Sequence, residues 1–448
     1  MSNYLIKNIT VVNEGKTFRG HVWIKNERII KVSADPEPPD TPPDTTKLDG
    51  RKRILIPGVI DDQVHFRDPG YTHKGDIYTE SRAAAAGGIT SYMEMPNTSP
   101  QTTTNKLLDK KLKSAQKKSL VNYSFFLGAT NDNLEELQNI DREKACGIKV
   151  FMGSSTGNML VDNPKTLAGI FSIPEVRIAV HSEDEKTILN NLAEFKEKFG
   201  DNIPVEYHPR IRSEEACYIS SLLAVNLAKK HNTNLHLIHV STARELELLE
   251  GGVHHDRKKI TSEACVHHLW FEESDYEDKG TLIKWNPAIK TSMDRDALIK
   301  GIIDDKIDII ATDHAPHTLE EKDNPYTKAP SGGPMVQHSL PVMMEFYHRG
   351  IIPLETIVKK MCHAPADIFK VLDRGYIREG YYADLVVIDP NDPWTVNKQN
   401  ILYKCGWSPL EGTTLKSRIT HTFVNGHLTF DNGIFNESRM GKALEFYT

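Results

Sequence analysis

Residues 307–317, IDIIATDHAPH, decide the fold of this chain. A short isoleucine-rich run is followed at once by the polar residues Asp313, His314 and His317. Continuous apolar runs of this length are typical of parallel strands that are buried on both faces. Seven earlier runs have the same texture: ILIPGVI (54–60), GITSYMEM (88–95), NYSFFLGA (122–129), GIKVFM (147–152), VRIAVH (176–181), LHLIHV (235–240) and KITSEACV (259–266).

The stretches between these runs are each long enough for a helix, for example EACYISSLLAVNLAKKH (215–231). Eight such repeats predict an α/β fold, a (β/α)8 TIM-type barrel over residues 54–374. Residues 1–53 and 375–448 contain short β-rich segments broken by turn residues. We expect these two segments to pair in a small β-sandwich, formed by both termini, that flanks the barrel.

Composition excludes several classes of protein. The 448 residues are 39% hydrophobic and 26% charged, as in ordinary globular proteins rather than collagen-like, coiled-coil or disordered ones. A net charge of -6 does not attract a polyanion, so we expect no nucleic-acid partner. The sequence contains neither a long apolar span nor a basic-apolar leader, which favours a cytoplasmic location without membrane contact. Five scattered cysteines without a CxxC indicate neither a disulfide framework nor a cysteine zinc site.

Polar side chains mark the strand ends at which a barrel carries its catalytic groups. The residues at or near these ends are His65, Arg67, Asn97, Lys149, His181, His239, His267, His268, Asp313 and His317. Imidazole and carboxylate are good zinc ligands, and a metal-bound water ionises near neutral pH. Taken alone, each of these histidines could equally be an ordinary core or surface residue rather than a metal ligand. Together, His65, His181, His239 and Asp313 predict a metal centre, whereas His267 and His268 are interpreted as packing residues beside it.

Lys149 lies inside an apolar strand. Desolvation lowers the pKa of a lysine and yields neutral amine, which can add carbon dioxide. The resulting carbamate is a carboxylate on a long stem and can bridge two metal ions. The alternative is a lysine that snorkels or pairs with an acid.

At these residues the chain resembles the cyclic amidohydrolases, and most closely the dihydroorotases. The motifs that carry the resemblance extend over nearly the whole chain: IPGVIDDQVHFRDPG, MPNT, HSED, HVSTARE, WNPAIKT, TDHAPHTLEEK and REGYYADLVVID. The resemblance implies a zinc-dependent enzyme that interconverts N-carbamoyl-L-aspartate and dihydroorotate in pyrimidine (UMP) synthesis. It also implies one or two zinc ions per chain and a homodimer.

The resemblance assigns roles residue by residue. His65 would bind the first metal, His181 and His239 the second, and carboxylated Lys149 would bridge them. Asp313 would bind the first metal and shuttle the proton. The residues that would contact substrate are Arg67, Asn97 and His317, at its carboxylate, and Asn286, Ser331 and Gly332, at its ring.

Gln63 departs from the family pattern, because the metal motif normally begins with His-x-His and this chain has Gln63-Val64-His65. A neutral amide oxygen is a poorer zinc ligand than imidazole. Three outcomes are open: weak ligation through the Gln63 oxygen, a first site completed by water, or loss of the first metal. Asp61 and Asp62 are further candidates to compensate, Asp61 by orienting a ligand.

This departure leaves three functions to compare. The first is an active dihydroorotase with an altered first site, which the retained Arg67, Asn97 and His317 favour. The second is an inactive dihydroorotase-like subunit that scaffolds aspartate transcarbamoylase. The third is a hydantoinase or allantoinase, whose substrates lack the carboxylate that Arg67 and His317 would bind.

Overall fold

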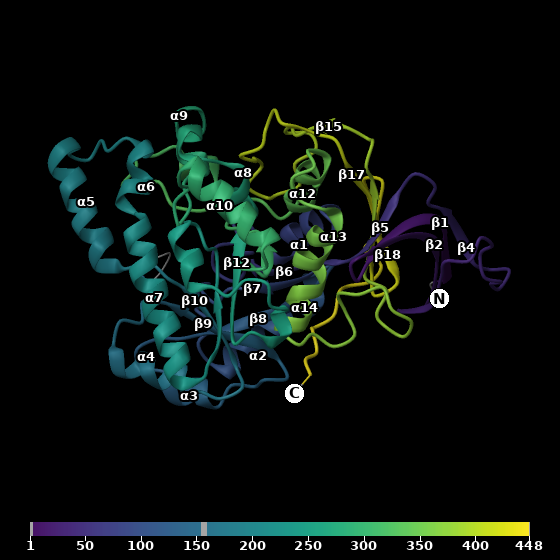
Figure 1. Cartoon of the computed structure of the whole chain (residues 1–448), viewed down its shortest axis with the longest axis horizontal. Helices are drawn as coiled ribbons and strands as arrows, with labels where there is room; N and C mark the ends of the chain where they lie inside the picture. Colours follow the sequence, from purple (N-terminus) through teal and green to yellow (C-terminus); the bar gives the residue numbers. More distant parts are fainter. Residues whose placement is uncertain (1–2, 154–158, 448) are drawn as a thin grey trace.

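The centre of the molecule is a parallel barrel. The computed structural model describes residues 3–153 and 159–447, and within them eight strands pair side by side in chain order (Figure 1). These strands are β6 (Val59–Val64), β7 (Ile89–Glu94), β8 (Asn122–Gly128), β9 (Ala145–Phe151), β10 (Arg177–His181), β11 (Asn234–Leu237), β12 (Ile260–Cys265) and β13 (Ile309–Ala311). A parallel bridge between Val64 and His314 joins the first strand to the last. The predicted barrel is therefore confirmed.

Helices cover the outside of the barrel. They are α1 (Ile77–Ala86), α2 (Asn105–Lys118), α3 (Leu134–Gln138), α4 (Pro164–Phe171), α5 (Glu185–Phe199), α6 (His208–Ile211), α7 (Glu214–His231), α8 (Val266–Trp270), α9 (Tyr276–Lys279), α10 (Ser292–Ile303), α11 (Leu319–Lys322), α12 (Ser339–His348), α13 (Leu354–Val358) and α14 (Ala364–Ile368). The predicted helix 215–231 is α7, which Ser213 caps by accepting a hydrogen bond from the Ala216 amide. No helix within the described ranges is both long and apolar enough to cross a bilayer.

One connection lacks the expected helix. Between β11 and β12 the described chain forms only two short 3-10 segments, η2 (Arg244–Leu248) and η3 (His255–Arg257). Gly251 and Gly252 lie between them, and glycine is costly inside a helix.

The predicted strand 54–60 is in fact two strands that belong to different sheets. Ile54–Pro57 forms β5, which pairs with the flanking strands, and the barrel begins only at Val59. The chain passes from one sheet to the other at Gly58, where a Cβ atom would lie 2.0 Å from the Thr90 hydroxyl oxygen. Only glycine fits this close approach.

The flanking unit is built from both ends of the chain, as expected (Figure 1). Its nine strands in the described residues form one sheet, in which β4 branches from β1. They are β1 (Asn3–Asn13), β2 (Lys16–Lys25), β3 (Arg28–Ser33), β4 (Thr46–Asp49), β5, β14 (Leu385–Asp389), β17 (Arg418–Val424), β18 (His427–Asp431) and β19 (Ile434–Phe435). A small hairpin, β15 (Trp394–Thr395) and β16 (Thr414–Leu415), lies apart from it.

The inside of the barrel is packed rather than open. Ile60, Met93, Phe126, Ile238 and Ile309 form one buried cluster, which α14 residues and Leu444 also join. Because this cluster fills the barrel with apolar side chains, we expect the polar catalytic groups at the carboxyl ends of the strands.

Candidate active site

The carboxyl ends of β6 and β13 bring Gln63, His65 and Asp313 together. Asp313 Oδ1 lies 3.1 Å from His65 Nε2, and it accepts a hydrogen bond of 3.1 Å from Gln63 Nε2. His65 Nδ1 lies 2.8 Å from Asn97 Oδ1. Because that oxygen can only accept, Nδ1 carries the proton and Nε2 presents its lone pair beside Asp313. These residues form one half of the predicted metal centre, and Asn97 here orients His65.

His181 and His239 form the other half, at the ends of β10 and β11. Their nearest nitrogens, His181 Nδ1 and His239 Nε2, are 2.9 Å apart. Burial lowers the pKa of both imidazoles, which keeps them neutral and available as ligands. Glu183 Oε2 lies 2.9 Å from His181 Nε2 and also pairs with Arg212.

Lys149, on β9, is near enough to both halves for its charge to act on their histidines. Its positive charge lowers the pKa of His65, His181 and His239, although burial is the larger cause for each. The side chain is 1% exposed, and within the described residues Nζ has no hydrogen-bond partner. Burial lowers the pKa of Lys149 to about 7. The negative charges of Glu263, Asp313 and Cys265 act to raise the pKa but do not outweigh burial. Nζ lies 4.8 Å from the centroid of the Phe151 ring, but a buried amine without a hydrogen-bond acceptor is unusual, and it fits a group that is modified or joined to a metal.

The donor set suits divalent metal ions of the zinc class. It offers three neutral imidazoles, one carboxylate and an amine that can become a carbamate. The close His181–His239 approach and the orphaned Lys149 amine are arrangements that a bound cation would satisfy.

The backbone is strained at this site. Arg67, His239 and Asp313 have φ values of 68°, 40° and 43°, in the left-handed region that residues other than glycine rarely occupy. Such strain concentrates at functional sites, where the surrounding structure holds it in place.

A buried charged cluster contacts the His239 backbone, and the sequence did not predict His236 or Glu263 as its members. His236 Nε2 lies 3.2 Å from Asp62 Oδ2 and 3.3 Å from Glu263 Oε2. Burial lowers the pKa of His236, but these carboxylates outweigh burial and raise it to about 9. Glu263 Oε1 accepts a hydrogen bond of 3.0 Å from the His239 amide. Glu263 could have been found in the same way as Lys149, because each is a charged residue inside an apolar strand.

Arg67 and His317 meet on the rim of the site. Arg67 Nη2 lies 3.1 Å from His317 Nε2, and Nε donates to the Pro316 carbonyl at 3.1 Å. Arg67 is 3% exposed, and no Asp or Glu of the described residues forms an ion pair with it. Burial lowers the pKa of Arg67 only to about 10, so the guanidinium stays charged at neutral pH.

The remaining predicted contacts lie on loops around this rim. The Gly332 amide donates to the Lys284 carbonyl at 2.8 Å, and a Cβ at Gly332 would lie 2.5 Å from the Ala315 oxygen. Ser331 is half-buried beside it. Asn286 follows Trp285 in the neighbouring loop, and its Oδ1 is buried without a hydrogen-bond partner among the described residues.

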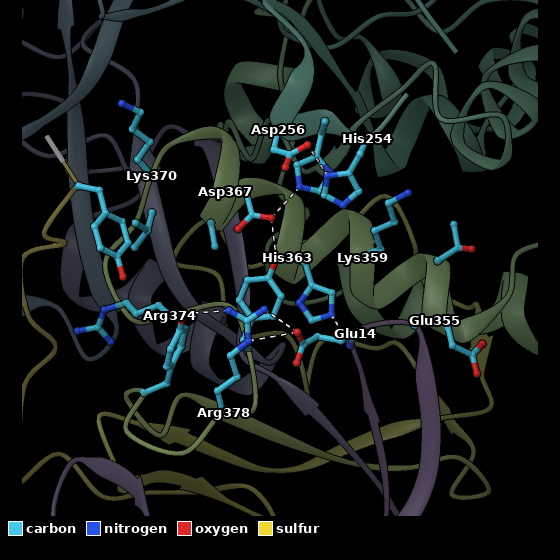
Figure 2. Close-up of a pocket in the computed structure, with 18 residues that line it drawn as sticks. Glu14, His254, Asp256, Glu355, Lys359, His363, Asp367, Lys370, Arg374 and Arg378 are labelled. Atoms are coloured by element: carbon cyan, nitrogen blue, oxygen red, sulfur yellow. Dashed lines mark hydrogen bonds and ion pairs between the residues drawn. The ribbon is translucent and has the colours of Figure 1, made fainter. Parts of the chain in front are cut away.

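A cavity of about 730 Å³ lies elsewhere, between the flanking sheet and the loop that leads into β12. Figure 2 shows His254, His363, Asp367 and Arg378 lining it. None of the predicted site residues is among those that line it. Because η3 precedes β12, this cavity is at the amino end of that strand, away from the end that carries barrel chemistry.

Comparisons with known proteins agree with this geometry. The model of the amidohydrolase family matches residues 54–429. The chain is 31% identical to the dihydroorotase of Methanosarcina acetivorans over 92% of this chain and 89% of that protein. It is 32% identical to the dihydroorotase of Pyrococcus furiosus, over 94% and 92%. The solved L-hydantoinase (dihydropyrimidinase) of Arthrobacter aurescens superposes with a TM-score of 0.92 at 25% identity, over 99% of this chain and 100% of that one.

Proposed function

The chain belongs to the amidohydrolase family and is a cyclic amide hydrolase, and we propose that it acts as a dihydroorotase. The proposed reaction is the reversible cyclisation of N-carbamoyl-L-aspartate to dihydroorotate and water, in pyrimidine synthesis. The cytoplasmic location, the homodimer and a contact with aspartate transcarbamoylase stay predictions beside it.

Arg67 carries the proposal. A buried guanidinium without a carboxylate partner is costly unless a ligand supplies one. Its planar fork can bind a carboxylate through two parallel hydrogen bonds. Dihydroorotate has such a carboxylate, whereas hydantoin and dihydrouracil do not. Arg67, which His317 holds in place by accepting a hydrogen bond from Nη2, therefore favours dihydroorotate over the uncharged rings of hydantoinase substrates, although the solved L-hydantoinase of Arthrobacter aurescens shares the fold.

Two metal positions fit the donors. His65 and Asp313 would hold one ion, His181 and His239 the other, and Lys149 as a carbamate would join them. Bound zinc would polarise the amide carbonyl and lower the pKa of water. Gln63 donates its amide hydrogen to Asp313, so its oxygen faces away from that carboxylate.

Asp313 is our candidate for the group that moves the proton. Its Oδ1 lies between His65 and Gln63, and its backbone is held in a strained conformation at the end of the barrel. We assign it the proton of the attacking water, which it returns to the ring nitrogen as that nitrogen leaves. Arg67 holds the substrate carboxylate meanwhile, which fixes the ring over these groups.

The deciding experiment measures hydrolysis of dihydroorotate by the purified protein, before and after chelation, with zinc counted on the same sample. Dihydrouracil, hydantoin and allantoin are assayed in parallel. Dihydroorotate turnover that is lost on chelation and restored by zinc supports the proposal. Preference for an uncharged ring contradicts it in favour of a hydantoinase-type enzyme. Absence of all turnover in folded, zinc-loaded, bicarbonate-treated protein contradicts it in favour of the scaffold subunit.

A further inference from the structure

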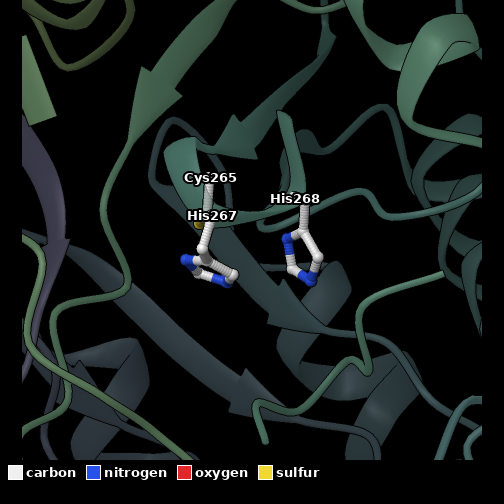
Figure 3. Close-up of side chains that lie close together, drawn as sticks. All are labelled: Cys265, His267 and His268. Atoms are coloured by element: carbon white, nitrogen blue, oxygen red, sulfur yellow. The ribbon is translucent and has the colours of Figure 1, made fainter. Parts of the chain in front are cut away.

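Cys265, His267 and His268 gather where β12 ends and α8 begins. One ligand atom from each, a sulfur and two ring nitrogens, lies within 4.8 Å of the other two. All three side chains are buried, with exposures of 0%, 0% and 3%. Figure 3 shows the two imidazoles side by side, with the sulfur close to His267. The sequence predicts packing residues at His267 and His268, and the structure adds Cys265 to them, which makes three side chains of types that can bind a metal.

His268 presents a free lone pair toward this cluster. Its Nε2 lies 3.0 Å from the Pro287 carbonyl oxygen, which can only accept, so Nε2 carries the proton. Nδ1 is therefore unprotonated, and within the described residues it is buried without a hydrogen-bond partner. A hydrogen bond on the opposite nitrogen is how proteins orient a metal-binding imidazole.

The ring of His267 is held in place by stacking. It lies parallel to Trp285, with ring centroids 4.2 Å apart and planes 12° from parallel. Its centroid is also 4.2 Å from that of His268. Two imidazoles whose orientations are fixed before binding reduce the ordering cost of capturing an ion.

Gln63 supplies a fourth donor atom. Its Nε2 donates to Asp313, so Oε1 points the other way and accepts a hydrogen bond of 3.5 Å from the Cys265 thiol, the proton that a metal ion would replace. Zinc–sulfur and zinc–oxygen bonds of about 2.3 and 2.1 Å, at the tetrahedral angle, place their ligand atoms about 3.6 Å apart. The observed separation matches the edge of such a tetrahedron.

We propose that Cys265, His267, His268 and the Gln63 amide oxygen bind a divalent ion of the zinc class, at a position beside the Lys149 centre that uses none of that centre's predicted histidine, lysine or aspartate ligands. One sulfur and two nitrogens favour zinc or cobalt over magnesium or calcium. Binding replaces the thiol proton, so the site gains one thiolate. Gln63 then serves this site instead of the first metal. The inference does not depend on the proposed function.

The test uses the full-length protein loaded with cobalt or zinc. A cobalt–thiolate bond gives a charge-transfer absorption in the near ultraviolet, and X-ray absorption at the zinc edge shows a zinc–sulfur distance of about 2.3 Å. We expect both signals in the wild-type protein. Cys265→Ser should lose the absorption and about one equivalent of metal by elemental analysis. Cys146→Ser, at another buried cysteine of the barrel, should retain both.

Two results would overturn the inference. One is wild-type protein that binds cobalt without a thiolate band and zinc without a sulfur neighbour. The other is folded Cys265→Ser protein that keeps the full metal content. If Cys265→Ser fails to fold, the zinc-edge spectrum of the wild-type protein still decides. Neither readout measures turnover, so a failed dihydroorotate assay leaves this test intact.

Discussion

Gln63 shows how one side chain redirects a site. Where the family pattern has imidazole, the amide has two different ends, and the structure uses both. The nitrogen binds Asp313 and the oxygen faces Cys265. An imidazole at this position would offer a single lone pair to the first metal. In the proposed arrangement, Gln63 would therefore bind the first metal more weakly than an imidazole and would offer its oxygen to the site at Cys265.

Arg67→Met tests substrate recognition at the residue scale. Removing one partner of a buried charge pair costs about 2–5 kcal/mol, so kcat/KM for dihydroorotate should fall about 30- to 5,000-fold. Any slow turnover of dihydrouracil should change by less than about 3-fold, because that ring has no carboxylate for Arg67 to bind. Steady-state assays of both substrates give the comparison. Equal losses on both would show that Arg67 maintains the site instead of binding the carboxylate.

Arg418→Met is the matched control for Arg67. Arg418 pairs with Asp392 on the surface, and both side chains are about half exposed at 40% and 45%. Its substitution should leave both activities within about 2-fold of wild type, because exposed ion pairs contribute little.

Lys149→Met tests the carbamate. The wild-type protein in 13C-bicarbonate should give a carbamate signal by NMR, and the variant should lose the signal together with bound metal. Dihydroorotate turnover should fall about 10³-fold or more, because a bridging ligand of the metals is gone. Persistence of the signal in Lys149→Met would refute this assignment.

Lys284 is the control for that experiment. Burial lowers its pKa to about 7, as for Lys149, so a lowered pKa alone does not distinguish them. Lys284 Nζ, however, donates to the carbonyls of Tyr326 and Ala329, at 2.7 and 2.5 Å. Its nitrogen is already engaged, and Lys284→Met should keep the carbamate signal.

At the scale of elements, strand positions were predictable and strand boundaries were not. Each of the eight apolar runs overlaps a barrel strand, because a buried parallel strand requires continuous apolar residues, although run 54–60 also covers β5 of the flanking sheet. The break at Gly58 depends on a contact with Thr90, which is distant in the sequence. Lys149 was visible as a charge in an apolar run. Cys265 was not, since a buried cysteine resembles any small apolar residue until its neighbours are known.

Asp305 lies in the turn between α10 and β13, and its ion pairs predict that the folded protein loses stability in acid. Burial raises its pKa, but hydrogen bonds of 2.7 Å from both Lys359 and Lys360 outweigh burial and hold it at about 2. A lowered folded-state pKa stabilises the protein above the unfolded value near 4, and the stabilisation is lost as pH falls toward 2. Discounted for partial exposure, the contribution is about 1 kcal/mol at pH 6 and about half of that at pH 3.

Urea unfolding of Asp305→Asn at these two pH values measures the contribution. The difference from wild type should be larger at pH 6 than at pH 3. Asp304→Asn is the control, because Asp304 pairs with Lys300 at exposures of 42% and 74% and should show almost no difference at either pH. A deficit of Asp305→Asn that is independent of pH would contradict the electrostatic origin.

At the scale of the whole molecule, a buried polar network joins the two units. Asp384 directly precedes β14 of the flanking sheet and pairs with Arg374, and each residue is 3% exposed. The Asp384 carboxylate also accepts hydrogen bonds from Asn122 of β8, at 3.1 Å, and from the Asn425 amide, at 2.7 Å. One carboxylate thus connects a barrel strand to two segments of the C-terminal region. The sequence predicted that the termini pair, but not the residue that fastens them to the barrel.

Asp384→Ala should therefore loosen the barrel from the flanking sheet. Removing one partner of a buried ion pair leaves an uncompensated charge, here on Arg374, and costs about 3–5 kcal/mol. Asp392→Ala breaks the exposed pair with Arg418 and should cost less than about 1 kcal/mol. Thermal unfolding, followed together with proteolysis of the folded protein, separates the two variants. If the network couples the units, Asp384→Ala lowers the unfolding temperature and exposes the C-terminal strands to cleavage while the barrel still resists. A fall in unfolding temperature no larger than that of Asp392→Ala would show that apolar packing alone holds the units together.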